Sequence, residues 1–171
     1  MTDTVLHQAD LALGANLGDR ADTLQTVIAR LKADDRLEVV GVSRLYTTSP
    51  VDSSGPDYIN GVVRVRTALS PMALLALCQA LEQDFGRVRP VGVHNAPRTL
   101  DVDVLTYDAL KSDDPRLVLP HPRMMDRLFV LVPLRDIDPT WTSPSGEGIE
   151  VAIARVHAAD PSQKIRVYEE S

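Results

Sequence analysis

Two aspartates, Asp101 and Asp103, lie one residue apart in the segment Arg98-Thr99-Leu100-Asp101-Val102-Asp103-Val104-Leu105. The alternation of apolar and acidic residues predicts a strand with both carboxylates on one face and their Cα atoms roughly 6.5 to 7 Å apart. Parallel carboxylates repel each other unless a positive charge lies between them, and hard cations such as Mg²⁺ bind carboxylate oxygens. The pattern therefore indicates a metal site. An edge strand with a solvated acidic face, and Arg98 as counter-charge, remains the alternative.

Three arginines precede these aspartates in a segment rich in glycine and proline. Arg87, Arg89 and Arg98 belong to residues 86–98, which show neither helical nor alternating periodicity and are predicted to form a long loop. Arginine is a rigid planar donor for phosphate oxygens, and Mg²⁺ commonly binds one or two carboxylates together with substrate phosphates. The loop and the two aspartates together indicate a polyphosphate ligand.

A face suited to a flat heterocycle is predicted on residues 57–67, which alternate as a strand. Tyr58 and Asn60 fall on the side opposite Ile59, Val63 and Val65. An aromatic plane beside an amide that both donates and accepts hydrogen bonds suits a planar ring. A solvated sheet face with a cross-strand tyrosine is the alternative.

A carboxylate lies out of place in the helix predicted over residues 70–85, which a Ser-Pro pair begins and a glycine ends. Glu82 falls in the apolar sector of this helix, and burial of a carboxylate without a partner is costly. It would border a polar cleft or pair with Arg87 or Arg89, or else reach water at the edge of the helix.

Two further residues follow the aspartates. His121 lies between two prolines, which fix its backbone and suit a pre-positioned phosphate donor, although a lone histidine is more often structural. Phe129 belongs to the apolar run 128–134, most of which must be core, and could serve as core or as an aromatic platform.

Strands and helices that alternate along the chain must position these groups. The glycine turn over 14–19 could cradle a phosphate or simply connect two elements, and residues 108–116 read as a hairpin excursion. The periodicities predict strands over 9–13, 37–48, 57–67, 100–105 and 164–168, and helices over 19–31, 70–85 and 148–158.

The composition fits one domain over residues 1–171, because 44% hydrophobic residues suffice for a core at this length. A net charge of −6 argues against a nucleic-acid ligand. Cys78 is the only cysteine, which excludes an intrachain disulfide and a thiolate zinc site. No segment resembles a signal peptide or a membrane span, so a cytoplasmic protein is expected.

Five segments share an order and spacing with one enzyme family: 13–19, 57–60, 81–89, 97–105 and 119–131. The block Pro-Arg-x-Leu-Asp-x-Asp-x-Leu followed by Pro-His-Pro is the specific part. Over about residues 9 to 140 the chain resembles the 6-hydroxymethyl-7,8-dihydropterin pyrophosphokinases of folate biosynthesis.

The resemblance implies an α+β, ferredoxin-like fold with a mainly antiparallel sheet and helices packed on both sides. It also implies transfer of pyrophosphate from ATP to the hydroxymethyl group of the reduced pterin, with release of AMP, by a protein expected to be a monomer. Positioning and electrostatics should dominate such a reaction.

The resemblance further implies residue roles. Asp101 and Asp103 would hold two Mg²⁺ ions, and Arg87 and Arg98 would act with them as catalytic residues at the phosphates. Tyr58 and Phe129 would enclose the pterin ring. The ATP-binding residues would be Gln79, Glu82, Arg87, Arg89, Arg98, Val104, Leu117, His121 and Arg127. The pterin-binding residues would be Thr48, Ser49, Val51, Tyr58, Asn60, Asp101 and Phe129.

Two departures from the family pattern stand out. The loop tryptophan of many members is Asn95 here, and Ala96 replaces a usual glycine, so closure over ATP would be less tight. The opening Gly-Ser-Asn is Gly-Ala-Asn, so a serine hydroxyl is absent at Ala15.

Two other functions are considered beside pyrophosphate transfer. One is a metal-dependent nucleotidyl or glycosyl transferase, and the other is a ligand-binding module without turnover.

Overall fold

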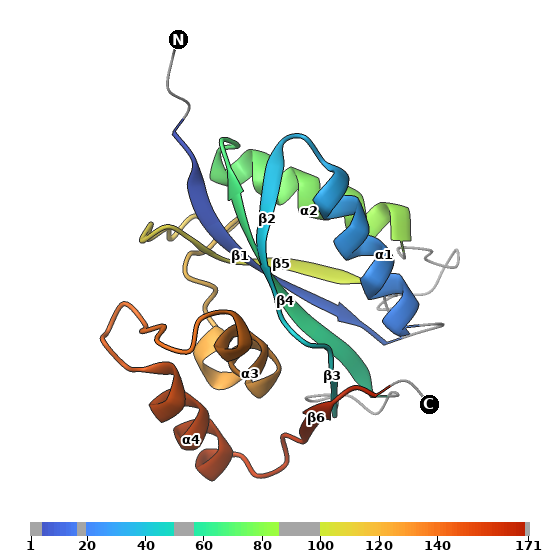
Figure 1. Cartoon of the computed structure of the whole chain (residues 1–171). Helices are drawn as coiled ribbons and strands as arrows, with labels where there is room; N and C mark the ends of the chain where they lie inside the picture. Colours follow the sequence, from blue (N-terminus) through green and yellow to red (C-terminus); the bar gives the residue numbers. More distant parts are fainter. Residues whose placement is uncertain (1–4, 17–19, 50–56, 86–99, 170–171) are drawn as a thin grey trace.

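A six-stranded antiparallel sheet forms the centre of the molecule (Figure 1). The computed structural model describes residues 5–16, 20–49, 57–85 and 100–169. Their elements, in chain order, are β1 (His7–Ala15), α1 (Arg20–Ala33), β2 (Leu37–Val42), β3 (Tyr46–Thr48), β4 (Tyr58–Thr67), α2 (Pro71–Phe85), β5 (Asp101–Tyr107), the 3-10 helix η1 (Met124–Asp126), α3 (Leu128–Ile137), α4 (Ile149–Ala159) and β6 (Ile165–Val167).

The sheet has the strand order β5-β1-β4-β3-β6, and β2 pairs with β4 next to β3. Every printed pairing is antiparallel. Two β-α-β units, β1-α1-β2 and β4-α2-β5, interleave so that each unit places a strand between the two strands of the other. This is the predicted ferredoxin-like arrangement, and it brings β1 to the middle of the sheet between β4 and β5.

Helices cover both faces of the sheet, as predicted (Figure 1). The helices α1 and α2 pack on one face, and α3 packs on the other with α4 against it. Strand alternation decides which residues each face receives. The α1/α2 face buries Leu11, Leu13, Ile59, Val63, Val65, Val102 and Val104. On the α3 face, Val62 and Leu105 pack against Val130 and Leu134.

The predicted strand over residues 37–48 was wrong as a single element, because the chain breaks it at Ser43 into β2 and β3. Ser43 N–H donates to the Val62 carbonyl at 2.9 Å, and its side-chain Oγ accepts from Val62 N–H at 2.8 Å. The hydroxyl therefore replaces a backbone carbonyl in the ladder. A register shift between Val39 and Gly41 bends β2 further.

The other element predictions agree with the structure to within a few residues. The hairpin excursion closes where Ser112 and Leu119 exchange backbone hydrogen bonds of 2.9 and 3.0 Å. The apolar run 128–134, for which no element was predicted, forms most of α3 with Pro133 inside it. None of the helices in the described ranges is long and apolar enough to cross a bilayer.

Candidate functional site

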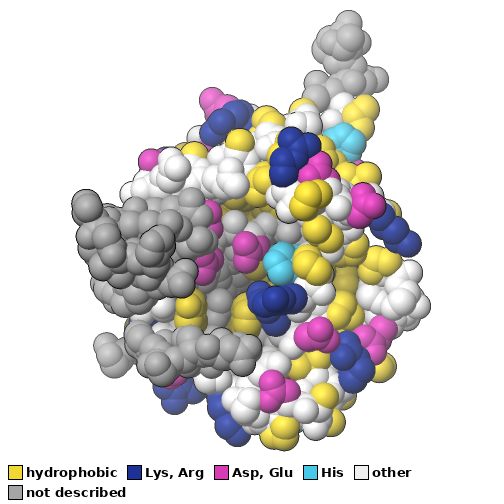
Figure 2. All heavy atoms as spheres, turned by 180° about the vertical axis from the view of Figure 1, so that it is seen from behind, with side chains coloured by type: hydrophobic (Ala, Val, Ile, Leu, Met, Phe, Trp, Pro, Cys, Tyr) yellow, Lys and Arg dark blue, Asp and Glu magenta, His cyan; other side chains and the backbone are white. Residues whose placement is uncertain are grey.

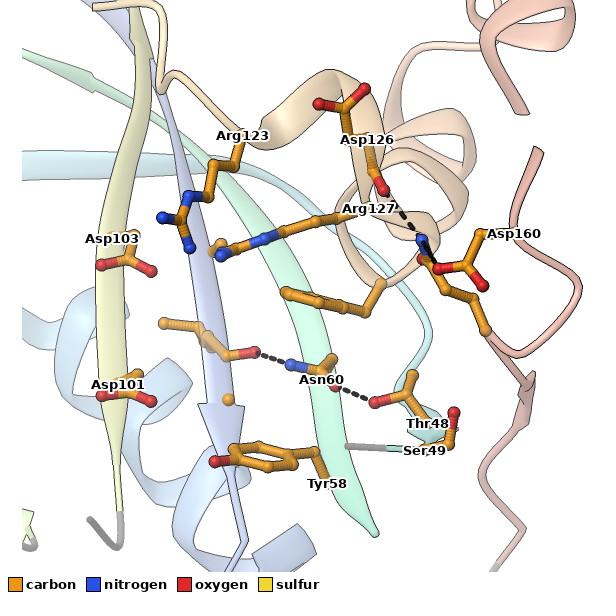
Figure 3. Close-up of a pocket in the computed structure, with 15 residues that line it drawn as sticks. Thr48, Ser49, Tyr58, Asn60, Asp101, Asp103, Arg123, Asp126, Arg127 and Asp160 are labelled. Atoms are coloured by element: carbon orange, nitrogen blue, oxygen red, sulfur yellow. Dashed lines mark hydrogen bonds between the residues drawn. The ribbon is translucent and has the colours of Figure 1, made fainter. Parts of the chain in front are cut away.

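A pocket of about 530 Å³ opens on the α3 face of the sheet, at the end where β1, β4 and β5 carry small and polar residues (Figure 3). Backbone register brings these residues together, since Gly14 pairs with Asn60 on one side and with Asp101 on the other. The lining consists of Ala12, Leu13, Gly14, Thr48, Ser49, Tyr58, Asn60, Asp101, Asp103, Arg123, Asp126, Arg127, Phe129, Asp160 and Gln163.

The two aspartates of β5 lie on the pocket side, as the alternation predicted (Figure 3). Both are partly exposed, whereas Val102 and Val104 between and beside them are buried on the α1/α2 side. The strand β5 is also an edge strand, so this part of the alternative was correct. The acidic face nonetheless forms a wall of the pocket.

Two arginines face these carboxylates from the segment around η1. Figure 3 shows Arg123 and Arg127 reaching into the pocket toward Asp103. Burial and the neighbouring Arg123 lower the pKa of Arg127, while Asp103 and Asp101 oppose this shift. Seen from behind, the molecule shows acidic and basic side chains around a hollow with a histidine beside them (Figure 2). The pocket thus brings cations and carboxylates together.

The carboxylate pair fits a magnesium ion that is bound jointly with a phosphate. Across the described ranges, no group of three or more His, Cys, Asp or Glu side chains is arranged to hold a metal. Mg²⁺ commonly uses one or two protein carboxylates and completes its octahedron with phosphate oxygens and water. Asp101 and Asp103 supply such a partial set, which would bind the ion tightly only with its phosphate ligand.

The other half of the pocket is a slot lined by an aromatic ring and a fixed amide. Thr48 Oγ1 donates to Asn60 Oδ1 at 2.5 Å, and Asn60 Nδ2 approaches the Leu13 carbonyl at 3.5 Å. These contacts orient the buried amide. Burial, together with the Asp101 carboxylate, raises the pKa of the Tyr58 phenol, which therefore stays neutral. Phe129 lines the same slot.

Gly14 forms the floor of this slot because its neighbours leave no room for a side chain. A Cβ at this position would lie 2.8 Å from Asn60 Nδ2 and 3.8 Å from Tyr58 Cδ2. The first distance is shorter than a normal contact, so the amide would have to move. Gly14 also begins the predicted glycine turn over 14–19, whose residues 17–19 lie outside the described ranges, so a phosphate role for that turn stays a prediction.

His121 lies near Asp103 without lining the pocket. Its backbone N–H donates to the Leu105 carbonyl at 2.8 Å, and its Nδ1 accepts from Arg123 N–H at 3.2 Å. The neutral ring therefore carries its proton on Nε2. Burial lowers the pKa of the imidazole, and Asp103 opposes the shift.

Four other residues predicted to bind ATP lie away from the pocket. Gln79 is exposed on α2, and the side chains of Val104 and Leu117 are buried in the core. Glu82 is 6% exposed, and its Oε2 accepts from Val102 N–H at 3.1 Å. The alternative in which Glu82 reaches water at the edge of the helix was therefore wrong, and its pairing with Arg87 or Arg89 stays a prediction. The contacts of these four residues with ATP stay predictions, and Arg87, Arg89, Arg98, Val51 and the loop residues Asn95 and Ala96 lie outside the described residues.

Several lining residues were not predicted. Arg123 directly follows the Pro-His-Pro segment and could have been found from its charge beside that motif. Asp126, Asp160 and Gln163 carry no comparable pattern, because the fold alone brings the turn after α4 against the start of α3. The small residues of β1 complete the lining.

A second hollow of about 360 Å³ lies at the other end of the same sheet face. Arg64 Nε donates to Asp10 Oδ1 at 2.8 Å, and Arg64 Nη1 donates to Asp138 Oδ2 at 3.2 Å. Thr106 Oγ1 donates to Asp10 Oδ2 at 3.0 Å. Three of the charged groups that line this hollow, Arg64, Asp10 and Asp138, are therefore paired with one another.

Comparison with known proteins identifies the family. The sequence profile of the 7,8-dihydro-6-hydroxymethylpterin-pyrophosphokinase family matches residues 10–139. The chain belongs to this family. It is 43% identical over 151 residues to the 2-amino-4-hydroxy-6-hydroxymethyldihydropteridine pyrophosphokinase of Synechocystis sp., covering 88% of this chain and 76% of that relative. The protein of the same name from Methylorubrum extorquens is 39% identical over 163 residues, 95% of this chain and 99% of the relative.

Solved structures of family members share the fold. The structure of Plasmodium falciparum HPPK-DHPS with pteroate matches with a TM-score of 0.68 and 14% identity, over 92% of this chain and 44% of that one. An HPPK-DHPS in complex with substrates gives 0.69 and 15%, over 90% of this chain and 46% of that one. The chain spans less than half of these proteins. At this identity the match supports the α+β fold only.

Proposed function

We propose that this chain transfers a pyrophosphoryl group from ATP to the hydroxymethyl group of 6-hydroxymethyl-7,8-dihydropterin, forming AMP and the pterin diphosphate in folate biosynthesis. Family membership and the names of the relatives support this activity. The observation that carries it is the joining of a carboxylate pair and an aromatic-amide slot in one pocket. A polyphosphate and a flat ring would meet there.

The slot suits the pterin. Tyr58 and Phe129 offer aromatic faces, and the Asn60 amide, held by Thr48, offers hydrogen-bonding groups of fixed orientation. An amide that is fixed before the ligand arrives loses little conformational entropy on binding. This arrangement favours a ring with donors and acceptors along one edge.

The carboxylate end suits the triphosphate. Asp101 and Asp103 would hold Mg²⁺, which supplies charge neutralisation for the phosphates. Arg123 and Arg127 lie across from them and would bind phosphate oxygens. Arg87 and Arg98 remain proposed catalytic partners from the segment outside the described residues.

In the proposed reaction the hydroxymethyl oxygen attacks the β-phosphorus of ATP. The bond from that phosphorus to the oxygen that bridges it to the α-phosphate breaks, AMP leaves with that oxygen, and the hydroxyl proton is released. The chain's part is to hold the two substrates in line and to stabilise the charge that moves onto the leaving oxygen.

The test is to incubate the protein with ATP, Mg²⁺ and 6-hydroxymethyl-7,8-dihydropterin and to separate the nucleotides. We expect AMP only when the pterin is present, together with an equal amount of pterin diphosphate. Formation of ADP, or no turnover, would contradict the proposal.

Three properties of the chain stay predictions. They are a single domain over residues 1–171, a monomeric state and a cytoplasmic location.

A further inference from the structure

The start of α3 places two pocket residues on either side of a buried one. Arg127 and Phe129 line the pocket, and the Arg127 guanidinium lies 5.2 Å from the centre of the Phe129 ring. Leu128 between them is 3% exposed. A shift of this short segment would therefore move an aromatic face and a cation of the pocket together.

The first helical N–H of α3 needs an acceptor from outside the helix. Arg127 is the N-cap residue, and its side chain makes no capping hydrogen bond. Instead, Gln163 Oε1 accepts from Leu128 N–H at 2.9 Å. Loss of this acceptor would leave a buried donor unpaired, which is costly.

The same amide also binds the residue on the other side of Arg127. Gln163 Nε2 donates to the Asp126 carbonyl at 2.9 Å and lies 3.4 Å from Asp160 Oδ2. One partner is an N–H and the other a carbonyl, so the amide has a single satisfactory orientation. Gln163 thus holds the backbone from Asp126 to Leu128 at two points.

Gln163 is itself anchored to the opposite wall of the pocket. Its neighbour Lys164 donates its backbone N–H to Ser49 Oγ at 3.0 Å, and Ser49 N–H donates to the Lys164 carbonyl at 3.1 Å. Thr48 pairs with Ile165 in the β3-β6 ladder. The turn after α4 therefore joins the wall that carries Thr48 to the wall that carries Phe129.

We infer that Gln163, which lies beyond the segment 10–139 that matches the family, is a positioning residue for pterin binding. It sets the distance between the Thr48–Asn60 edge and the Phe129 ring. This inference rests on the proposed function, because it assigns the slot to the pterin. It also makes residues 160–167 a working part of the site.

The experiment compares Gln163→Ala and Gln163→Met with the wild-type chain. Methionine keeps the length of the side chain and lacks both hydrogen bonds, so it separates bonding from bulk. We expect KM and Kd for the pterin to rise about tenfold in both variants, which corresponds to the net value of about one hydrogen bond, because only part of the lost support acts on the ligand. The kcat at saturating substrates should fall less than about threefold. Gln25→Ala, on the exposed side of α1, should change none of these values.

Two further measurements test the route of the effect. Hydrogen exchange of the Leu128 amide in the ligand-free protein should be slow in the wild type and fast in both variants. In a double-mutant cycle with Phe129→Leu, the losses of pterin affinity should be less than additive, because Gln163 acts through that ring. Additive losses, unchanged exchange at Leu128, or wild-type affinity in Gln163→Met would overturn the inference.

The exchange measurement needs no substrate, which separates the two proposals. Absence of AMP and of pterin binding in the wild type would refute the proposed function, and the role of Gln163 in pterin binding with it. Wild-type turnover with slow Leu128 exchange in both variants would refute the positioning role alone.

Discussion

Gly14→Ala tests the assignment of the pterin slot most directly. The added methyl would lie 2.8 Å from Asn60 Nδ2, on the floor of the pocket. The backbone at Gly14 is a regular part of β1, so the change introduces crowding and little backbone strain. To relieve the contact, the Asn60 amide must turn away from the Thr48 hydroxyl and the Leu13 carbonyl.

The cost can be worked out for stability and for binding separately. Overpacking typically costs about 1–3 kcal/mol, and replacing a strand glycine with alanine recovers about 0.5–1 kcal/mol. We therefore expect the free energy of unfolding to fall by about 1 kcal/mol. A displaced Asn60 amide would lose the one or two hydrogen bonds that we propose it makes to the pterin, each worth about 0.5–1.5 kcal/mol. The pterin Kd should thus rise about tenfold or more.

The assay is a pterin titration at equilibrium, with unfolding by urea measured on the same samples. Gly41→Ala is the matched control, because its Cβ would lie 2.9 Å from Ile137 Cγ2, on β2 and away from the pocket. We expect a comparable loss of stability and an unchanged pterin Kd. Wild-type pterin affinity in Gly14→Ala, or an equal loss of affinity in both variants, would refute the reasoning.

Three further predictions concern ionisable groups in the sheet and beside it. Asp101→Asn or Asp103→Asn should abolish AMP formation at any Mg²⁺ concentration. The unfolding midpoint should change little, because both side chains face the pocket, and near-normal turnover would exclude the metal assignment. Arg64→Met should lower the free energy of unfolding by about 3–5 kcal/mol, because the buried Asp10 carboxylate loses its cation and keeps only the hydrogen bond from Thr106. The kcat should be preserved below the unfolding temperature; urea unfolding checks the stability, and a neutral effect would contradict the prediction. Burial lowers the pKa of His121, so the unfolded chain binds a proton there at a higher pH than the folded chain does, and stability should fall as the pH drops below about 6.5. His121→Gln should weaken this pH dependence in unfolding curves measured at pH 5 to 7. An unaltered slope would argue against the prediction.

The elements that could be predicted from the sequence are those whose signals are local. The helix α2 begins at Pro71, and Ser70 Oγ accepts from Ala73 N–H at 3.2 Å, as the capping rules predict for a Ser-Pro pair. The β4 alternation assigned Tyr58 and Asn60 to one face because side-chain period alone decides this. The break at Ser43 could not be predicted, since it depends on a hydrogen bond to Val62 on another strand.

The candidate site was predictable to the same extent. Asp101, Asp103, Tyr58 and Asn60 all line one pocket, because β1 lies between β4 and β5 and carries Gly14 at the matching position. Glu82 was correctly singled out as unusual. Its contact with Val102 N–H of β5 could not be predicted, because only folding brings that edge of the sheet against α2.

Gln163 is the opposite case, and its chemistry explains why no sequence pattern points to it. Its amide binds the carbonyl of Asp126 and the N–H of Leu128, which are backbone groups that any residue other than proline would offer at those positions. The contact requires no particular side chain at positions 126 and 128, so the sequence there gives no sign of it. Side chains that strand alternation brings to one face can therefore be predicted from the sequence. The contacts of Gln163 that hold the two walls of the pocket in place cannot, because they form only when α4 and β6 have folded against β3 and α3.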